Sequence, residues 1–235
     1  MRLGPNEVSI NDVDAITPVY NFEKTYSYEA FICYGERNMF STLNRKNHAP
    51  KRKNLGAEYS RTNVLRPESL NMVYDRCHQM VAQTVPDSPR DIFPLLNYMT
   101  QYIISSFFFG DKNGSCCLQG EDTDFLGAWH IRHPTFHWLA ELPAVANMIY
   151  GSKFGDYLPT WRKAWEGEKK IIEIYDKWME RLDPQESYLY SKLVKAGLPP
   201  NEIGAEVMDH MGAGHETSGT TLTFLIDFLS KHPKI

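Results

Sequence analysis

The stretch HMGAGHETSGTT, which runs from His210 to Thr221, decides how the rest of this sequence is interpreted. It combines two histidines, three glycines and an acid that is followed by a threonine. Zinc sites, phosphate-binding loops and helices that hold a ligand against their backbone can all contain such residues. The spacing of the residues distinguishes these three kinds of site.

The spacing excludes a zinc-binding helix and a phosphate-binding loop. A zinc helix of the metalloprotease type needs two histidines four residues apart, whereas His210 and His215 are five apart and point to different faces of a helix. A phosphate loop needs a lysine after its last glycine, but Thr220 follows Gly219. Such a loop also follows a strand, and the apolar residues before this stretch recur at helical spacing.

A long helix with a weak centre is the remaining interpretation. Asn201 is predicted as its N-cap, and His232-Pro233 is predicted to end it after Lys231. Each glycine costs roughly 1 kcal/mol relative to alanine inside a helix. Apolar residues nevertheless keep helical spacing on both sides of the glycines: Ile203, Val207, Met211, Leu222, Leu225, Phe228 and Leu229.

The weak centre has two possible uses. Thr217 lies four residues after Ala213, so its hydroxyl can bond to that carbonyl and open the helix there. Ala213 and Gly214 then leave space for a flat ligand, and Glu216 adds an ionisable group for proton transfer. Alternatively, the glycines allow a second helix to pack closely.

The composition is that of an ordinary globular protein. The chain has 235 residues, of which 42% are hydrophobic and 23% are charged, which suits one domain or two. The formal charge of −4 gives no basis for nucleic-acid binding, and the basic residues between 45 and 53 are typical of a solvated face. No apolar run reaches the roughly 20 residues of a membrane span, no secretory signal is visible, and the four cysteines are expected to be reduced.

Helical periodicity dominates the rest of the chain. Val8 and Ile10 alternate with polar residues and predict one short strand near the N-terminus. Between residues 125 and 148, Pro134 and Pro143 interrupt an aromatic and histidine-rich segment, which predicts two short helices. No repeat or linker divides the chain, so a single, mainly α body is expected.

The six residues Ala213–Ser218 resemble the A-G-x-[DE]-T-[TS] signature of cytochrome P450 monooxygenases, where it lies on the long central helix over the haem. Other segments resemble the family in the expected order: residues 2–10 its first sheet segment in fungal members, 40–52 its C-helix region, and 103–110 the end of its E-helix. The resemblance covers nearly the whole chain. It implies an incomplete cytochrome P450 fold, from the B-helix to the I-helix, as a single partial domain over residues 1–235.

The resemblance also implies roles for four residues of the central helix. Thr217 would hydrogen-bond to dioxygen at the haem iron and to the protons that reach it, with Glu216 as the acidic relay partner. Ala213 and Gly214 would form the oxygen-side groove against the haem. Outside this helix, the hydrophobic and histidine-rich stretch from Trp129 to Trp138 is a candidate for the lining of a substrate channel.

His48 and Arg52 resemble the family's W-x-x-x-R pair with histidine in the place of tryptophan, as is usual in fungal members. One helical turn apart, both could reach the haem propionates, and an arginine suits a carboxylate bidentately. Pro50 departs from the pattern and is expected only within the first turn of a helix. The alternative for both residues is a solvated basic face.

The family's axial cysteine is missing from this chain. That thiolate binds the haem iron in F-x-x-G-x-R-x-C-x-G, and none of Cys33, Cys77, Cys116 and Cys117 has this context. The E-x-x-R pair of the K-helix and the N-terminal membrane anchor are missing as well. No metal ligand is therefore assigned within the chain, and membrane association is expected only through an anchor outside it.

Three hypotheses remain. In the first, the chain is part of a monooxygenase that inserts one oxygen atom from dioxygen into a lipophilic small molecule, such as a fungal secondary metabolite. Haem, a reductase partner and electrons ultimately from NADPH are then implied, as is a location at the cytosolic face of the endoplasmic reticulum membrane. In the second, the chain is a truncated, inactive remnant. In the third, it is a helical binding protein with a groove between Ala213 and Thr217.

Overall fold

A computed structural model describes residues 1–5, 7–84, 89–182 and 187–234. These residues form eleven α-helices, six 3-10 helices and one two-stranded sheet, joined by loops. The helices are α1 (Ile16–Asn21), α2 (Arg45–Gly56), α3 (Arg61–Val64), α4 (Pro67–Gln83), α5 (Phe93–Phe109), α6 (Asp124–Arg132), α7 (Phe136–Glu141), α8 (Pro143–Ile149), α9 (Pro159–Glu180), α10 (Leu189–Lys195) and α11 (Pro200–Lys231). The 3-10 helices are η1 (Val13–Ala15), η2 (Tyr26–Phe31), η3 (Asp111–Asn113), η4 (Cys117–Gln119), η5 (His133–Thr135) and η6 (Gly155–Tyr157). The expectation of a mainly α fold is confirmed.

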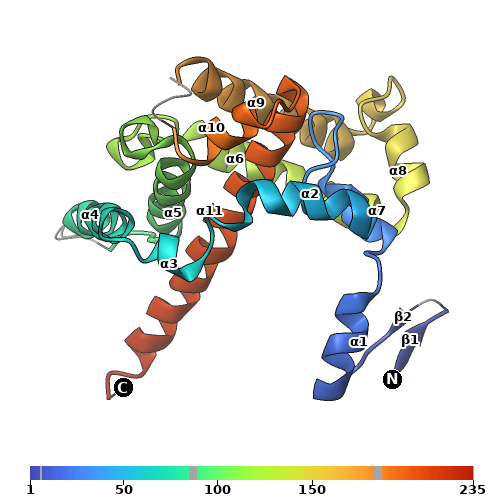
Figure 1. The fold of residues 1–235 in the computed structure, drawn as a ribbon, viewed down its shortest axis with the longest axis horizontal. Helices are drawn as coiled ribbons and strands as arrows, with labels where there is room; N and C mark the ends of the chain where they lie inside the picture. Colours follow the sequence, from blue (N-terminus) through green and yellow to red (C-terminus); the bar gives the residue numbers. More distant parts are fainter. Residues whose placement is uncertain (6, 85–88, 183–186, 235) are drawn as a thin grey trace.

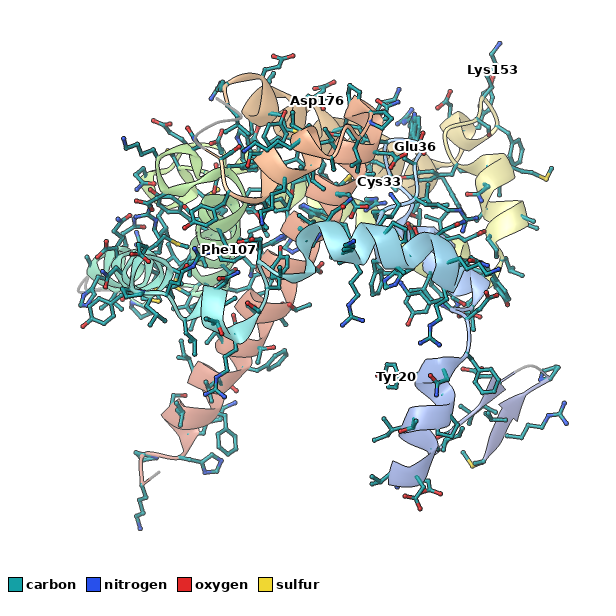
Figure 2. The ribbon with its side chains drawn as sticks, in the orientation of Figure 1. Tyr20, Cys33, Glu36, Phe107, Lys153 and Asp176 are labelled. Carbon is teal, nitrogen blue, oxygen red and sulfur yellow. The ribbon has the colours of Figure 1, made fainter. Side chains whose placement is uncertain are left out.

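The short N-terminal β segment is a hairpin. Strand β1 (Arg2–Gly4) pairs antiparallel with β2 (Glu7–Val8), so the expectation of one strand reaching Ile10 is wrong. The hairpin and α1 project from the rest of the molecule (Figure 1). Figure 2 shows Tyr20 on α1 away from the helices that enclose Cys33, and Tyr20 is 84% exposed. The functional elements therefore lie elsewhere.

Helix α11 runs through the centre of the molecule and is continuous from Pro200 to Lys231 (Figure 1). Its N-cap is Pro199 rather than the predicted Asn201, because Pro200 occupies the first helical position, where a missing N–H costs nothing. The helix ends before His232 as predicted. Because this segment is helical, no phosphate loop exists at the glycines.

The predicted bond between Thr217 and Ala213 is present, but the helix does not open there. The Thr217 hydroxyl donates to the carbonyl oxygen of Ala213 at 2.7 Å, while the residues around both remain α-helical. A carbonyl oxygen has two lone pairs and can accept a second hydrogen bond beside the helical one. The prediction of an opened helix was therefore wrong.

The glycines of α11 serve close packing. A Cβ at Gly214 would lie 2.5 Å from Ile104 of α5, and a Cβ at Gly212 would lie 2.6 Å from the Trp129 ring of α6. Gly219 meets Asn97 of α5 in the same way, at 2.8 Å. The interpretation of the glycines as helix-packing positions is thus supported at all three sites.

Replacing Gly214 with alanine should destabilise the protein by about 1–3 kcal/mol, since the β-branched Ile104 side chain cannot move aside without repacking. Gly127 is the matched control: it also lies inside a helix, but an added Cβ there meets nothing within 4 Å. Gly127→Ala should therefore stabilise by up to about 1 kcal/mol. Urea unfolding of both variants measures the difference, and equal effects would refute the packing role.

The last part of α11 carries exposed apolar side chains. It extends away from the other helices (Figure 1), and its exposed residues are Phe224, Leu225, Ile226, Phe228 and Leu229. Contiguous apolar surface of this kind promotes association. Among the described residues, no helix is both long and apolar enough to cross a membrane.

Candidate functional site

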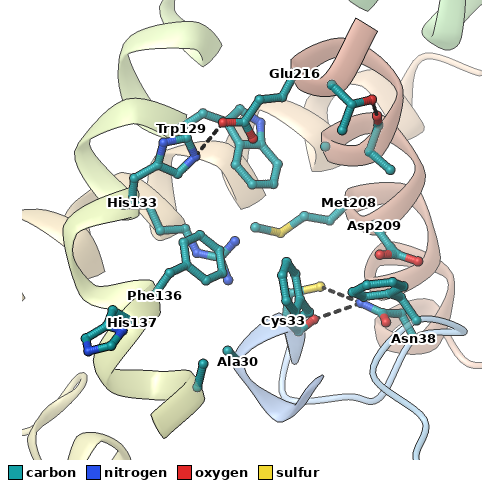
Figure 3. Close-up of a pocket in the computed structure, with 17 residues that line it drawn as sticks. Ala30, Cys33, Asn38, Trp129, His133, Phe136, His137, Met208, Asp209 and Glu216 are labelled. Atoms are coloured by element: carbon teal, nitrogen blue, oxygen red, sulfur yellow. Dashed lines mark hydrogen bonds and ion pairs between the residues drawn. The ribbon is translucent and has the colours of Figure 1, made fainter. Parts of the chain in front are cut away.

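A cavity of about 710 Å³ lies between α11, the α6–α7 segment and the loop that precedes α2 (Figure 3). Its lining is mostly apolar, as is usual for sites that bind small organic molecules. Trp129, Arg132, His133, Phe136 and His137 belong to the stretch that was expected to line a channel, and all five line the cavity. That this cavity admits a substrate remains a proposal.

One face of α11 forms a wall of this cavity. Gly212 and Ala213 lie three and four residues after Asp209, and Glu216 lies four and three residues after them, so all four project from the same side of the helix. Thr217 lies beside them. Ala213 and Thr217 are both exposed, which leaves one turn of this helix open to a ligand.

Glu216 is paired with a histidine from another element. Its carboxylate lies 3.0 Å from Nε2 of His133 on η5 (Figure 3), and both side chains are about one-third exposed, at 37% and 34%. The hydrogen bond from His133 is the largest influence on Glu216 and holds its pKa below the usual value. His133 could not be singled out from the sequence, because nothing in the local pattern shows which residue of the η5 segment reaches α11.

Replacing His133 with glutamine should raise the pKa of Glu216, because the side chain whose hydrogen bond and charge lower that pKa is replaced by a neutral amide. Carbon NMR of the glutamate side chains during an acid titration would measure the change. His137→Gln is a matched control, since His137 lines the same cavity but forms no hydrogen bond or ion pair with Glu216. An unchanged Glu216 titration in His133→Gln would refute the pairing in solution.

A buried ion pair holds the opposite wall. The Arg132 Nε donates to Glu168 of α9 at 3.0 Å, and the two side chains are only 3% and 8% exposed. The Tyr150 hydroxyl donates to the same carboxylate oxygen at 2.6 Å. The Arg132 guanidinium also lies 4.6 Å from the centre of the Phe136 ring, so this pair fixes the apolar wall of the cavity.

His48 and Arg52 lie on α2 outside the cavity lining. His48 is half-buried and Arg52 is exposed, and the Arg52 side chain has no hydrogen-bond or ion-pair partner among the described residues. Burial lowers the pKa of His48, and the nearby charges of Lys24 and Arg52 lower it further. Lys24 and Arg52 thus form a positive patch beside His48 that suits an anionic group.

Pro50 lies inside α2, five residues after Arg45. The expectation that it belongs to the first turn is therefore wrong. The missing N–H removes one backbone bond within the helix, yet His48 and Arg52 remain on one continuous helix, one turn apart.

The other predicted residues are distributed as follows. Gly214 lies against α5 rather than in the cavity lining, so its role beside a haem stays a prediction. Burial lowers the pKa of both His210 and His215 to about 4, and both are therefore neutral. The His210 Nδ1 bonds to the Tyr59 hydroxyl, and the His215 Nδ1 bonds to the Met211 carbonyl.

The four cysteines are free thiols. Burial raises the pKa of each of them, to about 12 for Cys33 and Cys117. Cys33 lines the cavity, but its Sγ donates to the Ala205 carbonyl. None of them is placed as a ready thiolate.

Comparison with known proteins shows the family. The family model for cytochrome P450 matches residues 51–235, which include α11 and the cavity residues contributed by α6, α7 and η5. The chain belongs to the cytochrome P450 family.

Similar proteins come from fungi. The chain is 23% identical to the cytochrome P450 monooxygenase FGM1 of Gibberella zeae, with 99% of this chain and 50% of that protein aligned. It is 23% identical to the monooxygenase ppzE of Metarhizium majus over 95% of this chain and 50% of that protein. It is 21% identical to the monooxygenase tazI of Aspergillus terreus over 100% of this chain and 51% of that protein. The chain thus spans about half the length of the curated relatives it matches.

The residues present fit one face of a haem. Ala213 and Thr217 offer an open turn without large side chains at the edge of an apolar cavity, which suits the flat face of a porphyrin. The unpaired Arg52 guanidinium carries a positive charge that suits a propionate, and the His48 imidazole one turn away can add a hydrogen bond. The donor set does not include an ionised thiol, so the fit concerns the oxygen side of the haem alone.

Proposed function

We propose that this chain forms the oxygen-side wall and the substrate cavity of a haem-dependent monooxygenase. The observation that carries the proposal is the solvent-exposed helical turn from Ala213 to Thr217, which faces the apolar cavity beside the Glu216–His133 pair. Haem would supply the activation of dioxygen. The residues of this chain would bind the substrate, limit access of water and deliver protons.

The proton path follows from the contacts of α11. His133 and Glu216 can exchange a proton across their 3.0 Å contact, and Glu216 is adjacent in sequence to Thr217. The Thr217 hydroxyl donates to the Ala213 carbonyl in the resting structure, while its lone pairs are free to accept from water or from an acid. Rotation of this hydroxyl would pass a proton into the cavity.

The cavity favours a lipophilic small molecule, because aromatic side chains and Met208 make up much of its wall. A single oxygen atom would be inserted into this molecule, and the electrons would come ultimately from NADPH through a reductase. The names of the fungal relatives describe those proteins as monooxygenases, which supports the same reaction class here.

The test uses a haem-loaded protein that carries this chain, supplied with NADPH, a reductase and isotopically labelled dioxygen. Incubation with a panel of lipophilic compounds should give products that contain one labelled oxygen atom. Binding of these compounds to the cavity without any labelled product would overturn the proposal in favour of a binding protein.

Replacing Arg52 with alanine should lower haem retention roughly fivefold, the equivalent of about 1 kcal/mol for an exposed charge pair. Absorbance of haem per mole of protein after gel filtration measures this. Lys46→Ala, an exposed basic position near the start of α2, is the control for net charge. Equal haem content in both variants would leave Arg52 as a solvated residue.

A further inference from the structure

Three carboxylates of α11 lie on or near the cavity wall, and two of them are paired with basic side chains. Glu216 is paired with His133. Glu206 accepts hydrogen bonds from the Lys51 ammonium at 3.1 Å and from the Met39 backbone N–H at 3.0 Å. Asp209, which lies between them on the helix, lines the cavity and is joined to no cation by an ion pair within the described residues.

Lys24, whose charge acts on Asp209, has its hydrogen bonds elsewhere. The Lys24 ammonium donates to the carbonyl oxygens of Met39 and Phe40, at 3.1 and 2.7 Å, and lies over the Tyr28 and Phe40 rings. It contributes a favourable field at Asp209 but no direct contact. A half-buried carboxylate beside an apolar cavity therefore lacks a counter-ion, which is a costly arrangement unless a ligand supplies one.

We infer that Asp209 anchors a protonated amine on the ligand of this cavity, so that the preferred ligand is a lipophilic molecule with one basic nitrogen. The cavity supplies the apolar contacts, through residues such as Trp129 and Phe136. Figure 3 shows Asp209 and Glu216 at separate places along the α11 wall. At 1.5 Å rise per residue, the seven-residue separation of Asp209 and Glu216 places the amine about 10 Å along the helix from Glu216. That this ligand is also a substrate rests on the proposed function.

The charges around Asp209 predict how binding depends on pH. Burial and the neighbouring Glu206 raise the pKa of Asp209 to about 7, against the opposing effects of the Phe40 backbone N–H and Lys24. On α11 itself, His210 is neutral, and Lys51 of α2 acts on Glu206. An amine with a pKa near 10 stays protonated throughout, so its affinity should rise as the pH increases through 7 and Asp209 ionises.

The experiment compares two ligands of the same shape in the full chain without added haem. N,N-dimethyl-4-phenylbutylamine carries the charge, and (5-methylhexyl)benzene replaces its nitrogen with carbon. Equilibrium dialysis at pH 8.5 gives the ratio of their affinities for the wild type, Asp209→Asn and Glu216→Gln. If the amine forms a hydrogen-bonded charge pair with Asp209, the ratio of amine affinity to carbon-analogue affinity should fall about tenfold or more in Asp209→Asn and stay unchanged in Glu216→Gln.

A repeat of the wild-type measurement at pH 5.5 does not depend on how a variant folds. Amine affinity should be lower there than at pH 8.5, while the affinity of the carbon analogue stays constant. Equal pH behaviour of the two ligands, loss of the preference in Glu216→Gln instead, or no binding of either ligand would overturn the inference. Because no haem is present, an amine preference without monooxygenase activity would count against the proposed function alone.

Discussion

Replacing Glu168 with alanine should lower the free energy of unfolding by about 3–5 kcal/mol. Arg132, at 3% exposure, would lose its charge partner inside the protein, and the Tyr150 hydroxyl would lose its acceptor. The charge cannot be removed by deprotonation, because a guanidinium stays protonated in proteins even without a partner. A domain is stable by only about 5–15 kcal/mol, so this single change removes a large part of the total.

Urea unfolding followed by circular dichroism measures the loss. Lys170→Ala is the matched control on the same helix: it breaks the ion pair with Asp124, whose two side chains are 50% and 73% exposed, and should cost at most about 1 kcal/mol. Glu168→Gln keeps an acceptor for Tyr150, so its loss of unfolding free energy should lie between those of Glu168→Ala and Lys170→Ala. If Glu168→Ala costs no more than Lys170→Ala, the buried pair does not stabilise the cavity wall.

The features that depend on sequence-local contacts could be predicted, and those that depend on distant segments could not. The bond between Thr217 and Ala213 follows from four-residue spacing on a helix, and it is present. Gly212 and Gly214 were open to two interpretations, because a missing side chain does not show what occupies its place. Only the positions of Trp129 and Ile104 decide that these glycines serve packing.

The candidate site shows the same limit. The family signature identified Glu216 and Thr217, but the partner of Glu216 comes from a 3-10 turn more than eighty residues earlier in the chain. Asp209 precedes the signature and has an unremarkable sequence context. Its importance becomes visible only from the structure, in which Asp209 lines the cavity while the Lys24 and Lys51 ammonium groups bond to other acceptors. The overall helical fold needed no such information, since periodicity alone encodes it.

Replacing Thr217 with alanine in a haem-loaded protein that carries this chain should uncouple oxygen use from product formation. The hydroxyl beside Glu216 is the last protein group of the proposed proton path, and a positioned proton donor contributes roughly a hundredfold or more to the step that it assists. Water can replace part of that effect in an open turn, so we expect product per NADPH to fall roughly tenfold. Product yield and NADPH consumption in the same reaction measure the ratio.

Thr221→Ala is the matched control for this prediction. The Thr221 hydroxyl makes the same kind of bond one turn later, to the Thr217 carbonyl at 2.7 Å, but Thr221 does not line the cavity. Loss of the bond alone would affect both variants equally, whereas a proton path affects Thr217→Ala alone and is restored in Thr217→Ser. An unchanged ratio of product to NADPH in Thr217→Ala would remove this residue from the path and leave its hydroxyl with a structural role on α11.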